Sequence, residues 1–182
     1  MKVAHLAIAS DLFGNRDEEA ALILSAKDGN RAAFGELYDR YARMVHAIAL
    51  AYLPHQEAED LVQDVFVRAL ERLMGLQSPA AFGGWLCAIA RNTALDQLRK
   101  RKAFTELAPE YRAKNGREIE ALTVLAEIQH LPESYRETLI MRLVEGLTGP
   151  EIAAQTGLTP DSVRVNLHRG MKLLRKRLQV SS

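Results

Sequence analysis

Residues 148–170 read TGPEIAAQTGLTPDSVRVNLHRG, and this stretch largely decides the fold. Glu151 follows Thr148 at the three-residue spacing of a capping box, which marks the start of a helix. Gly157 suits the left-handed backbone that ends a helix, and Pro160 suits the first position of the next one. Two helices joined at this spacing predict a helix-turn-helix.

The second helix of this unit, from about Pro160 to Leu178, combines an apolar face with a basic one. Its inward positions are Val163, Leu167 and Leu174. Its charged positions are Asp161 and six cations, namely Arg164, Arg169, Lys172, Arg175, Lys176 and Arg177. Such a helix can place its first turns against base edges and its later turns along phosphates. The other interpretation is a solvated helix whose cations stabilise its carboxyl end. The turn spacing favours DNA binding.

Composition places the chain among folded soluble proteins, because 48% of its 182 residues are hydrophobic and 26% are charged. The longest apolar stretch, residues 44–53, is well short of the roughly 20 residues that a membrane span needs. The first ten residues are too weakly apolar for a secretory signal. We therefore expect a cytoplasmic protein without membrane insertion. The net charge of +1 neither favours nor excludes a nucleic-acid partner.

Cysteine and histidine usage gives no sign of a cofactor. Cys87 is the only cysteine, so the chain has no intramolecular disulfide and no cysteine-based zinc site. It stands in the apolar run WLCAIA, where a small buried hydrophobic residue is favoured over a reactive thiol. His55 and Glu59 stand four residues apart, but no second histidine or partner motif completes a metal site. The sequence therefore predicts neither a metal nor another cofactor.

The chain is predicted to be all-α. Strand signals are almost absent, whereas apolar residues recur at three- and four-residue intervals along most of its length. We expect two small helical domains joined by a flexible linker, with the helix-turn-helix in the second. The predicted parts are an amino-terminal extension (1–24), a first domain (25–102), a linker (103–120) and a second domain (121–182). The linker is marked by Pro109, Asn115 and Gly116 among mixed charges.

Four helices are expected before the linker, over about residues 18–27, 31–53, 57–74 and 80–102. Asn30 can cap the second of them, and Pro54 ends it. Phe82 and Trp85 share an apolar stripe at the start of the fourth helix. Their spacing favours core packing over stacking on an unpaired base.

The helix predicted over residues 57–74 carries an acidic ridge opposite its apolar stripe. The ridge consists of Asp60, Gln63, Asp64 and Glu71. One interpretation is that these acidic residues, near the amino end of the helix, do no more than stabilise the helix dipole. The other interpretation is a docking surface for a basic partner.

The helix predicted over residues 80–102 is the basic counterpart of the ridge. It carries Arg91, Arg99, Lys100, Arg101 and Lys102 against a single acid, Asp96. Asn92, Asp96 and Arg99 follow one another at helical spacing and share one exposed face. Amide and guanidinium groups on such a face can read bases and hold phosphates. A second DNA-contacting surface, separate from the helix-turn-helix, is therefore predicted.

Four motifs stand in one order along the chain. They are DGNRAAFGELYDRY from Asp28, EDLVQDVF from Glu59, WLCAIARNTALDQLRKR from Trp85, and LPESYRETLIMR from Leu131 with the helix-turn-helix after it. This order resembles the bacterial sigma-70 family of RNA polymerase initiation factors, in particular its extracytoplasmic-function (ECF) group. The resemblance covers residues 26–178.

The resemblance implies three binding surfaces and no catalytic residue. Core RNA polymerase would bind Asp60, Gln63 and Asp64. The minus-10 promoter element would contact Gln77, Ser78, Arg91, Asn92, Asp96, Arg99 and Arg101, with the loop 75–82 capturing a flipped-out base. The minus-35 element would contact Ser162, Arg164, Val165, Asn166, His168, Arg169 and Lys172. Members of the family are often held by an inhibitory anti-sigma protein.

The resulting hypothesis is a transcription initiation factor without enzymatic activity, which binds core RNA polymerase and places it on two elements of promoter DNA. Without polymerase, its domains are expected to pack together or to be held by an anti-sigma factor. The alternative is a stand-alone dimeric regulator that uses the helix-turn-helix on half-sites. A metal-dependent hydrolase, a third class, would need a convergent set of ligands that the sequence does not offer.

Overall fold

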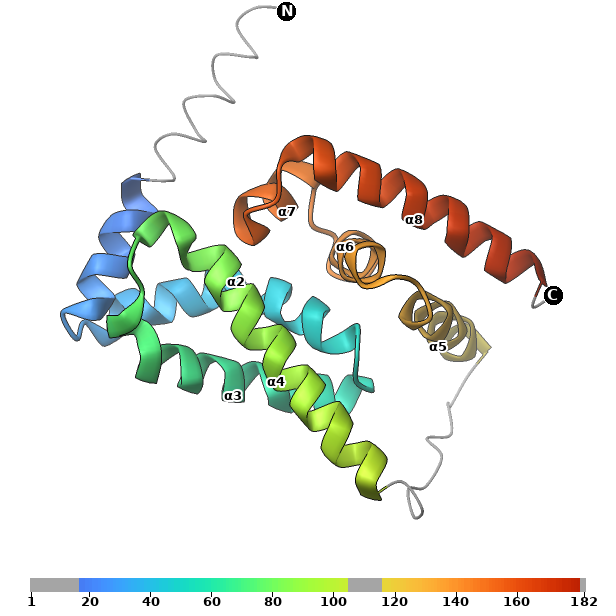
Figure 1. Cartoon of the computed structure of the whole chain (residues 1–182), viewed down its shortest axis with the longest axis horizontal. Helices are drawn as coiled ribbons and strands as arrows, with labels where there is room; N and C mark the ends of the chain where they lie inside the picture. Colours follow the sequence, from blue (N-terminus) through green and yellow to red (C-terminus); the bar gives the residue numbers. More distant parts are fainter. Residues whose placement is uncertain (1–16, 105–115, 181–182) are drawn as a thin grey trace, which may run out of the picture.

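The computed structural model describes residues 17–104 and 116–180, and within these ranges the chain is helical without any strand (Figure 1). The first block comprises a helix over residues 17–27, then α2 (Arg31–Leu50), α3 (His55–Arg72) and α4 (Phe82–Phe104). Two 3-10 turns, η1 (Leu73–Gly75) and η2 (Pro79–Ala81), lie between α3 and α4. The second block comprises α5 (Gly116–Gln129), α6 (Glu133–Leu143), α7 (Gly149–Thr156) and α8 (Pro160–Val180). The predicted all-α class is confirmed.

Helix boundaries differ slightly from those expected. The helix α3 begins at His55, directly after Pro54. Its predicted last turn is instead the 3-10 turn η1. At the linker, α4 continues to Phe104 and α5 already begins at Gly116. Residues 105–115, most of the expected linker, and residues 1–16 of the expected extension lie outside the described residues.

The predicted cap of α2 is present. The Asn30 side-chain oxygen accepts hydrogen bonds from the backbone N–H groups of Ala32 at 3.0 Å and Ala33 at 3.3 Å. Gly29, just before it, has a φ of 89°, which only glycine adopts without strain. The sharp turn between the first helix and α2 therefore follows directly from the Gly29-Asn30 pair.

The predicted helix-turn-helix is formed by α7 and α8. The Glu151 carboxylate accepts from the Thr148 N–H at 2.6 Å, while the Thr148 hydroxyl accepts from the Glu151 N–H at 3.4 Å, closing the capping box. Gly157 ends α7 with a φ of 75°. Thr159 then accepts from the Ser162 N–H at 3.1 Å at the start of α8. The local signals of the sequence thus fix this unit.

The core of the first block is built from the apolar stripes of α2, α3 and α4. Tyr41 and Phe82 are fully buried and meet edge to face, with ring centroids 5.1 Å apart. The predicted packing role of Phe82 is confirmed, and Trp85 is half-buried beside it. Cys87 is buried, as predicted, with its thiol 3.3 Å from the Met44 sulfur. No helix in the described part of the chain is long and apolar enough to cross a membrane.

The two blocks pack against each other. The helix α6 lies against α2, and α7 contacts both α2 and α4 (Figure 1). Gly83 of α4 touches the backbone of α7 so closely that a Cβ at this position would overlap the carbonyl oxygen of Gln155. Buried residues of both blocks therefore form one continuous cluster.

Candidate nucleic-acid and partner interfaces

The acidic ridge is a solvent-facing strip of α3. All four of its residues, Asp60, Gln63, Asp64 and Glu71, are exposed. The opposite side of α3 is buried against the first block through Leu61, Val62, Val65 and Phe66. No ion pair found in the described residues involves the ridge carboxylates. They are available to an external cation.

Three apolar side chains are exposed on the same helix and turn. Val67 is 58% exposed, Leu70 52% and Met74 71%. At about 100° per residue, Val67 falls on the face of the ridge, within about 60° of Asp60, Gln63 and Asp64. Acidic and apolar groups mixed on one exposed face are typical of a protein-binding surface. Sequence reasoning missed these three residues, although they stand outside the apolar stripe predicted for the helix.

The exposed face predicted for α4 is present. Asn92, Asp96 and Arg99 are exposed and line one polar pocket beside α3. Within it, Arg99 donates to the Asp96 carboxylate at 3.0 Å. This pair holds the guanidinium over the pocket while leaving most of its surface in solvent, since the Arg99 side chain is 76% exposed.

Arg91 does not join that face. It points toward the second block, where its guanidinium donates to Glu137 of α6 at 3.0 and 2.8 Å and pairs with Glu133 at 2.8 Å. These carboxylates raise the pKa of Arg91 above its usual range, against the opposing effect of burial, so the guanidinium stays charged. Arg101, also predicted to contact DNA, lies 3.6 Å from Glu57 of α3.

Glu137 is the centre of a contact that sequence reasoning missed. Its carboxylate also accepts from the Tyr52 hydroxyl at 2.9 Å, and the Arg136 guanidinium lies over the Tyr52 ring, 4.4 Å from the centroid. We call Tyr52, Arg91, Arg136 and Glu137 the Glu137 cluster. Burial is the main cause that raises the pKa of Tyr52, and the negative charge of Glu137 is the second. The available signal was a charged residue at a core position of α6, next to buried Thr138.

Further polar contacts tie the blocks together. The Gln129 amide donates to the backbone carbonyls of Leu50 and Leu53 at 2.8 and 3.3 Å, and the Gln155 amide donates to that of Arg40 at 3.0 Å. A hydrogen bond of 2.7 Å joins His46 Nδ1 to Glu145.

The loop residues predicted to meet a base, Gln77 and Ser78, are exposed between η1 and η2. The Gln77 amide donates to the Gly75 carbonyl at 3.3 Å, which is a contact within the loop. The loop therefore presents polar groups outward from the first block.

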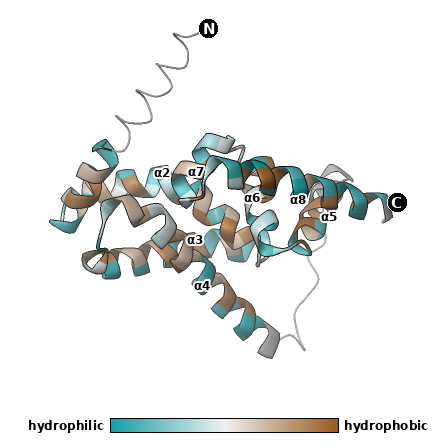
Figure 2. Cartoon of the chain, turned by 45° about the horizontal axis from the view of Figure 1, so that its top comes forward, coloured by the Kyte–Doolittle hydropathy of each residue, from teal (hydrophilic) through white to brown (hydrophobic). Residues whose placement is uncertain are grey.

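The exposed face predicted for α8 is also present. Arg164, Val165, His168, Arg169 and Lys172 are exposed, whereas Ser162 and Asn166 are half-buried. Arg164 donates to Asp161 one turn earlier at 3.1 Å, in a pair open to solvent. In Figure 2 most of α8 is hydrophilic.

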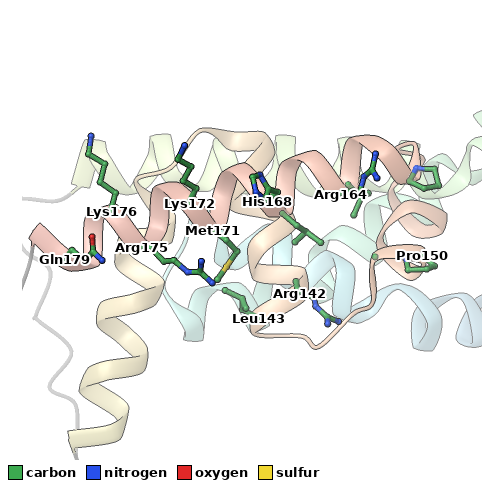
Figure 3. Close-up of a pocket in the computed structure, with 14 residues that line it drawn as sticks. Arg142, Leu143, Pro150, Arg164, His168, Met171, Lys172, Arg175, Lys176 and Gln179 are labelled. Atoms are coloured by element: carbon green, nitrogen blue, oxygen red, sulfur yellow. The ribbon is translucent and has the colours of Figure 1, made fainter.

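A groove of about 1100 Å³ runs along α8, between it and the end of α6. Leu143, Leu167 and Met171 give it apolar walls, and its rim is basic (Figure 3). Lys172 and Lys176 point outward from α8 in this view. Gly170 lets α8 approach α6, because a Cβ there would lie 3.0 Å from Leu139. The glycine therefore has a packing role.

The described residues contain no group of three or more histidine, cysteine or acidic side chains that could hold a metal. His55 and Glu59 form only an exposed pair, 3.6 Å apart. Burial, followed by the charge of Glu137, raises the pKa of the Cys87 thiol to about 12. At neutral pH this thiol is protonated, which does not suit a nucleophile.

Comparisons with known proteins match both blocks. Residues 37–104 match the family profile described as Sigma-70 region 2, and residues 121–174 match Sigma-70, region 4. The ECF RNA polymerase sigma factor SigW of Bacillus subtilis is 28% identical, over 86% of this chain and 95% of its own. The RNA polymerase sigma factor SigV of the same species is 31% identical, over 73% and 83%. Among solved structures, CnrH in complex with the cytosolic domain of CnrY has a TM-score of 0.63 at 26% identity, covering 90% of this chain and 99% of that one.

Proposed function

Because the chain belongs to the sigma-70 family, within its ECF group, we infer that it is a transcription initiation factor that binds core RNA polymerase and directs it to specific promoters. The observation that carries this conclusion is the order of the two matches. Region 2 coincides with the block that bears the acidic ridge and the basic face of α4, and region 4 coincides with the helix-turn-helix. The stand-alone dimeric regulator, in which the first block would sense a ligand or mediate dimerisation, is not favoured, because that block matches Sigma-70 region 2.

We propose that Asp60, Gln63 and Asp64 bind core polymerase. Support comes from their exposure and lack of partners within the described residues. The apolar side chains of Val67, Leu70 and Met74 extend the same surface. Removing them from water on docking would add affinity that charge alone cannot supply.

The proposed contact with the minus-10 element lies on α4 and the preceding loop. Its members are Gln77, Ser78, Arg91, Asn92, Asp96, Arg99 and Arg101. The shared face of Asn92, Asp96 and Arg99 supports the proposal most directly. Arg91 is engaged by Glu137 while the blocks are packed, so its contact with DNA requires α6 to move away from α2 and α4.

The proposed contact with the minus-35 element is the first half of α8, which would enter the major groove of duplex DNA. Its members are Ser162, Arg164, Val165, Asn166, His168, Arg169 and Lys172. Support comes from the capping box and the αL turn, which hold α7 and α8 in the helix-turn-helix arrangement. Cations in later turns are suited to phosphates.

We further propose that the factor catalyses no reaction itself and works in the cytoplasm with polymerase. Residues 25–102 and 121–182 are proposed to act as separate domains joined by residues 103–120. An anti-sigma factor is a further proposed partner, as the family resemblance implies, and the structurally similar CnrH was solved in complex with another protein, the cytosolic domain of CnrY. Such a protein would compete for the surfaces used by polymerase.

Run-off transcription with purified core polymerase on a promoter library tests the proposed function. We expect the factor to select a subset of promoters that core polymerase alone does not transcribe. Duplex binding by the factor alone, without any association with core polymerase, would contradict the proposal and support the dimeric regulator instead.

A further inference from the structure

A polar pocket of about 290 Å³ lies between α3 and α4. Besides Asn92, Asp96 and Arg99 of α4, it is lined by Arg68 and Arg72 of α3. Among the lining residues, three arginines stand against a single acid, Asp96, with which Arg99 is already paired. The pocket therefore carries excess positive charge and suits an anion.

Arg68 and Arg72 have no acidic partner among residues 17–104 and 116–180. Arg68 is half-buried and Arg72 is exposed, and both line the pocket. Unpaired arginines that line a concave surface are suited to phosphate, because the guanidinium fork matches its oxygens.

The position of the two arginines links the proposed surfaces. At about 100° per residue, Arg68 and Arg72 lie about 40° and 80° around α3 from Asp64. They stand between the acidic ridge and the exposed face of α4, where Asn92 offers an amide that can read a base. A DNA strand on α4 that continues toward polymerase on the ridge would cross them.

We propose that Arg68 and Arg72 bind a phosphate of the promoter strand whose bases meet the exposed face of α4. This inference rests on the proposed function and adds a second helix to its minus-10 surface. The contact positions the strand and carries no sequence information, because every nucleotide presents the same phosphate. Neither arginine belongs to the surfaces that the sequence motifs indicate.

The experiment compares wild type with the Arg68→Gln/Arg72→Gln variant, each assembled with core polymerase. Affinity is measured across a salt series on a promoter fragment whose minus-10 region is held open by mismatches. We expect unchanged affinity for core polymerase and DNA binding about tenfold weaker, the loss of roughly one charged hydrogen bond. The salt dependence of log K should fall by about 0.7 for each phosphate contact removed from a single strand.

Matched variants separate a phosphate contact from general charge. Arg31→Gln removes one exposed arginine at the start of α2 and should leave DNA affinity within twofold of wild type. Arg68→Lys/Arg72→Lys keeps the charge and should recover part of the lost affinity. If the double glutamine variant does not fold, Arg72→Gln alone and the lysine pair carry the test.

A neutral methylphosphonate, placed in turn at each linkage of the open strand, identifies the phosphate that is bound. At one linkage it should weaken wild type but not the glutamine variant. Equal weakening of both at every linkage, or wild-type affinity and salt dependence in the glutamine variant, would overturn the inference. So would loss of core binding, which would place the arginines in the polymerase interface. If wild type itself fails to bind core polymerase, the proposed function fails instead.

Discussion

Arg91 of α4 donates two hydrogen bonds to Glu137 of α6, from Nε to Oε1 at 3.0 Å and from Nη2 to Oε2 at 2.8 Å. The two residues lie 46 positions apart in the sequence and belong to different blocks. The Glu137 side chain is 9% exposed and that of Arg91 is 33% exposed. A charged, bidentate contact between the blocks therefore uses an arginine that is also proposed to hold DNA.

Glu137→Gln should destabilise the packed chain by about 2 kcal/mol, because it replaces a charged bidentate acceptor in a mostly buried site. Urea denaturation measures the loss. Glu133→Gln is the matched control: it touches the same guanidinium from a carboxylate that is 50% exposed, and should cost under about 1 kcal/mol. Equal losses in the two variants would contradict the central role of Glu137.

Gly83→Ala should push the blocks apart, since its methyl group would overlap the Gln155 carbonyl oxygen. Small-angle scattering is expected to show a larger radius of gyration than wild type, and overpacking should cost about 1–3 kcal/mol. At the neighbouring Gly84 a Cβ would lie 3.5 Å from the Thr156 oxygen, an ordinary contact. Gly84→Ala should therefore keep the packed shape and gain up to about 1 kcal/mol of helix propensity. Identical scattering from wild type and both variants would contradict the prediction that a methyl group at position 83 separates the blocks.

Charge reversal of the ridge by Asp60→Lys/Asp64→Lys should weaken binding to core polymerase at least tenfold, because like charges would then meet in the interface. Fluorescence anisotropy of the labelled factor measures this. Glu36→Lys/Asp39→Lys makes the same charge change on exposed positions of α2 and is the control. Normal complex formation by the ridge variant would remove the assignment of this surface.

Arg164→Ala should reduce discrimination at one base pair of the upstream element by about 1–3 kcal/mol, because its guanidinium stands in the first turns of α8. Lys172→Ala, two turns later, should instead weaken binding to all sequences alike and lower the salt slope by about 1. Competition binding with single-base variants distinguishes the two. Uniform weakening by Arg164→Ala would place that residue on a phosphate.

Cys87 should react slowly with iodoacetamide at pH 8.5. Its thiol pKa of about 12 leaves about a thousandfold less thiolate than an unperturbed cysteine. Because the folded state favours the neutral thiol, its contribution to stability is complete below about pH 9 and declines as the pH rises toward 12. The same chain in guanidinium chloride, where the thiol is exposed, is the control for the alkylation rate. Equal rates in both solutions would show that the burial is not maintained.

Local sequence signals predicted the fold well. Three local features were predicted: the Asn30 cap, the Thr148–Glu151 capping box and the Gly157 turn. Each depends on residues within four positions of one another, so it can be predicted without knowing the rest of the structure. The exposed faces of α3, α4 and α8 followed from helical periodicity for the same reason. Which residues on those faces contact polymerase or DNA stays a prediction.

Contacts between helices could not be predicted in this way. Tyr52 and Glu137 are hydrogen-bonded although they lie 85 positions apart in the sequence, and no local sequence pattern near either residue predicts the contact. The sequence likewise does not single out Arg68 and Arg72, because helical phase places them beside the ridge but does not show that they share a pocket with residues of α4. Arg91 was assigned to DNA on its type and position, and only the packing of α6 reveals its present partner.

The glutamine contacts between the blocks have an evolutionary consequence. Gln129 and Gln155 donate to main-chain carbonyls of Leu50, Leu53 and Arg40, and every amino acid supplies such an oxygen. The side chain at an acceptor position takes no part in these hydrogen bonds, whereas replacing either glutamine amide would abolish the bonds that it donates. These attachments therefore constrain the identity of the two glutamines and not that of the three acceptors, of which Leu50 and Leu53 are constrained separately by their burial in the core.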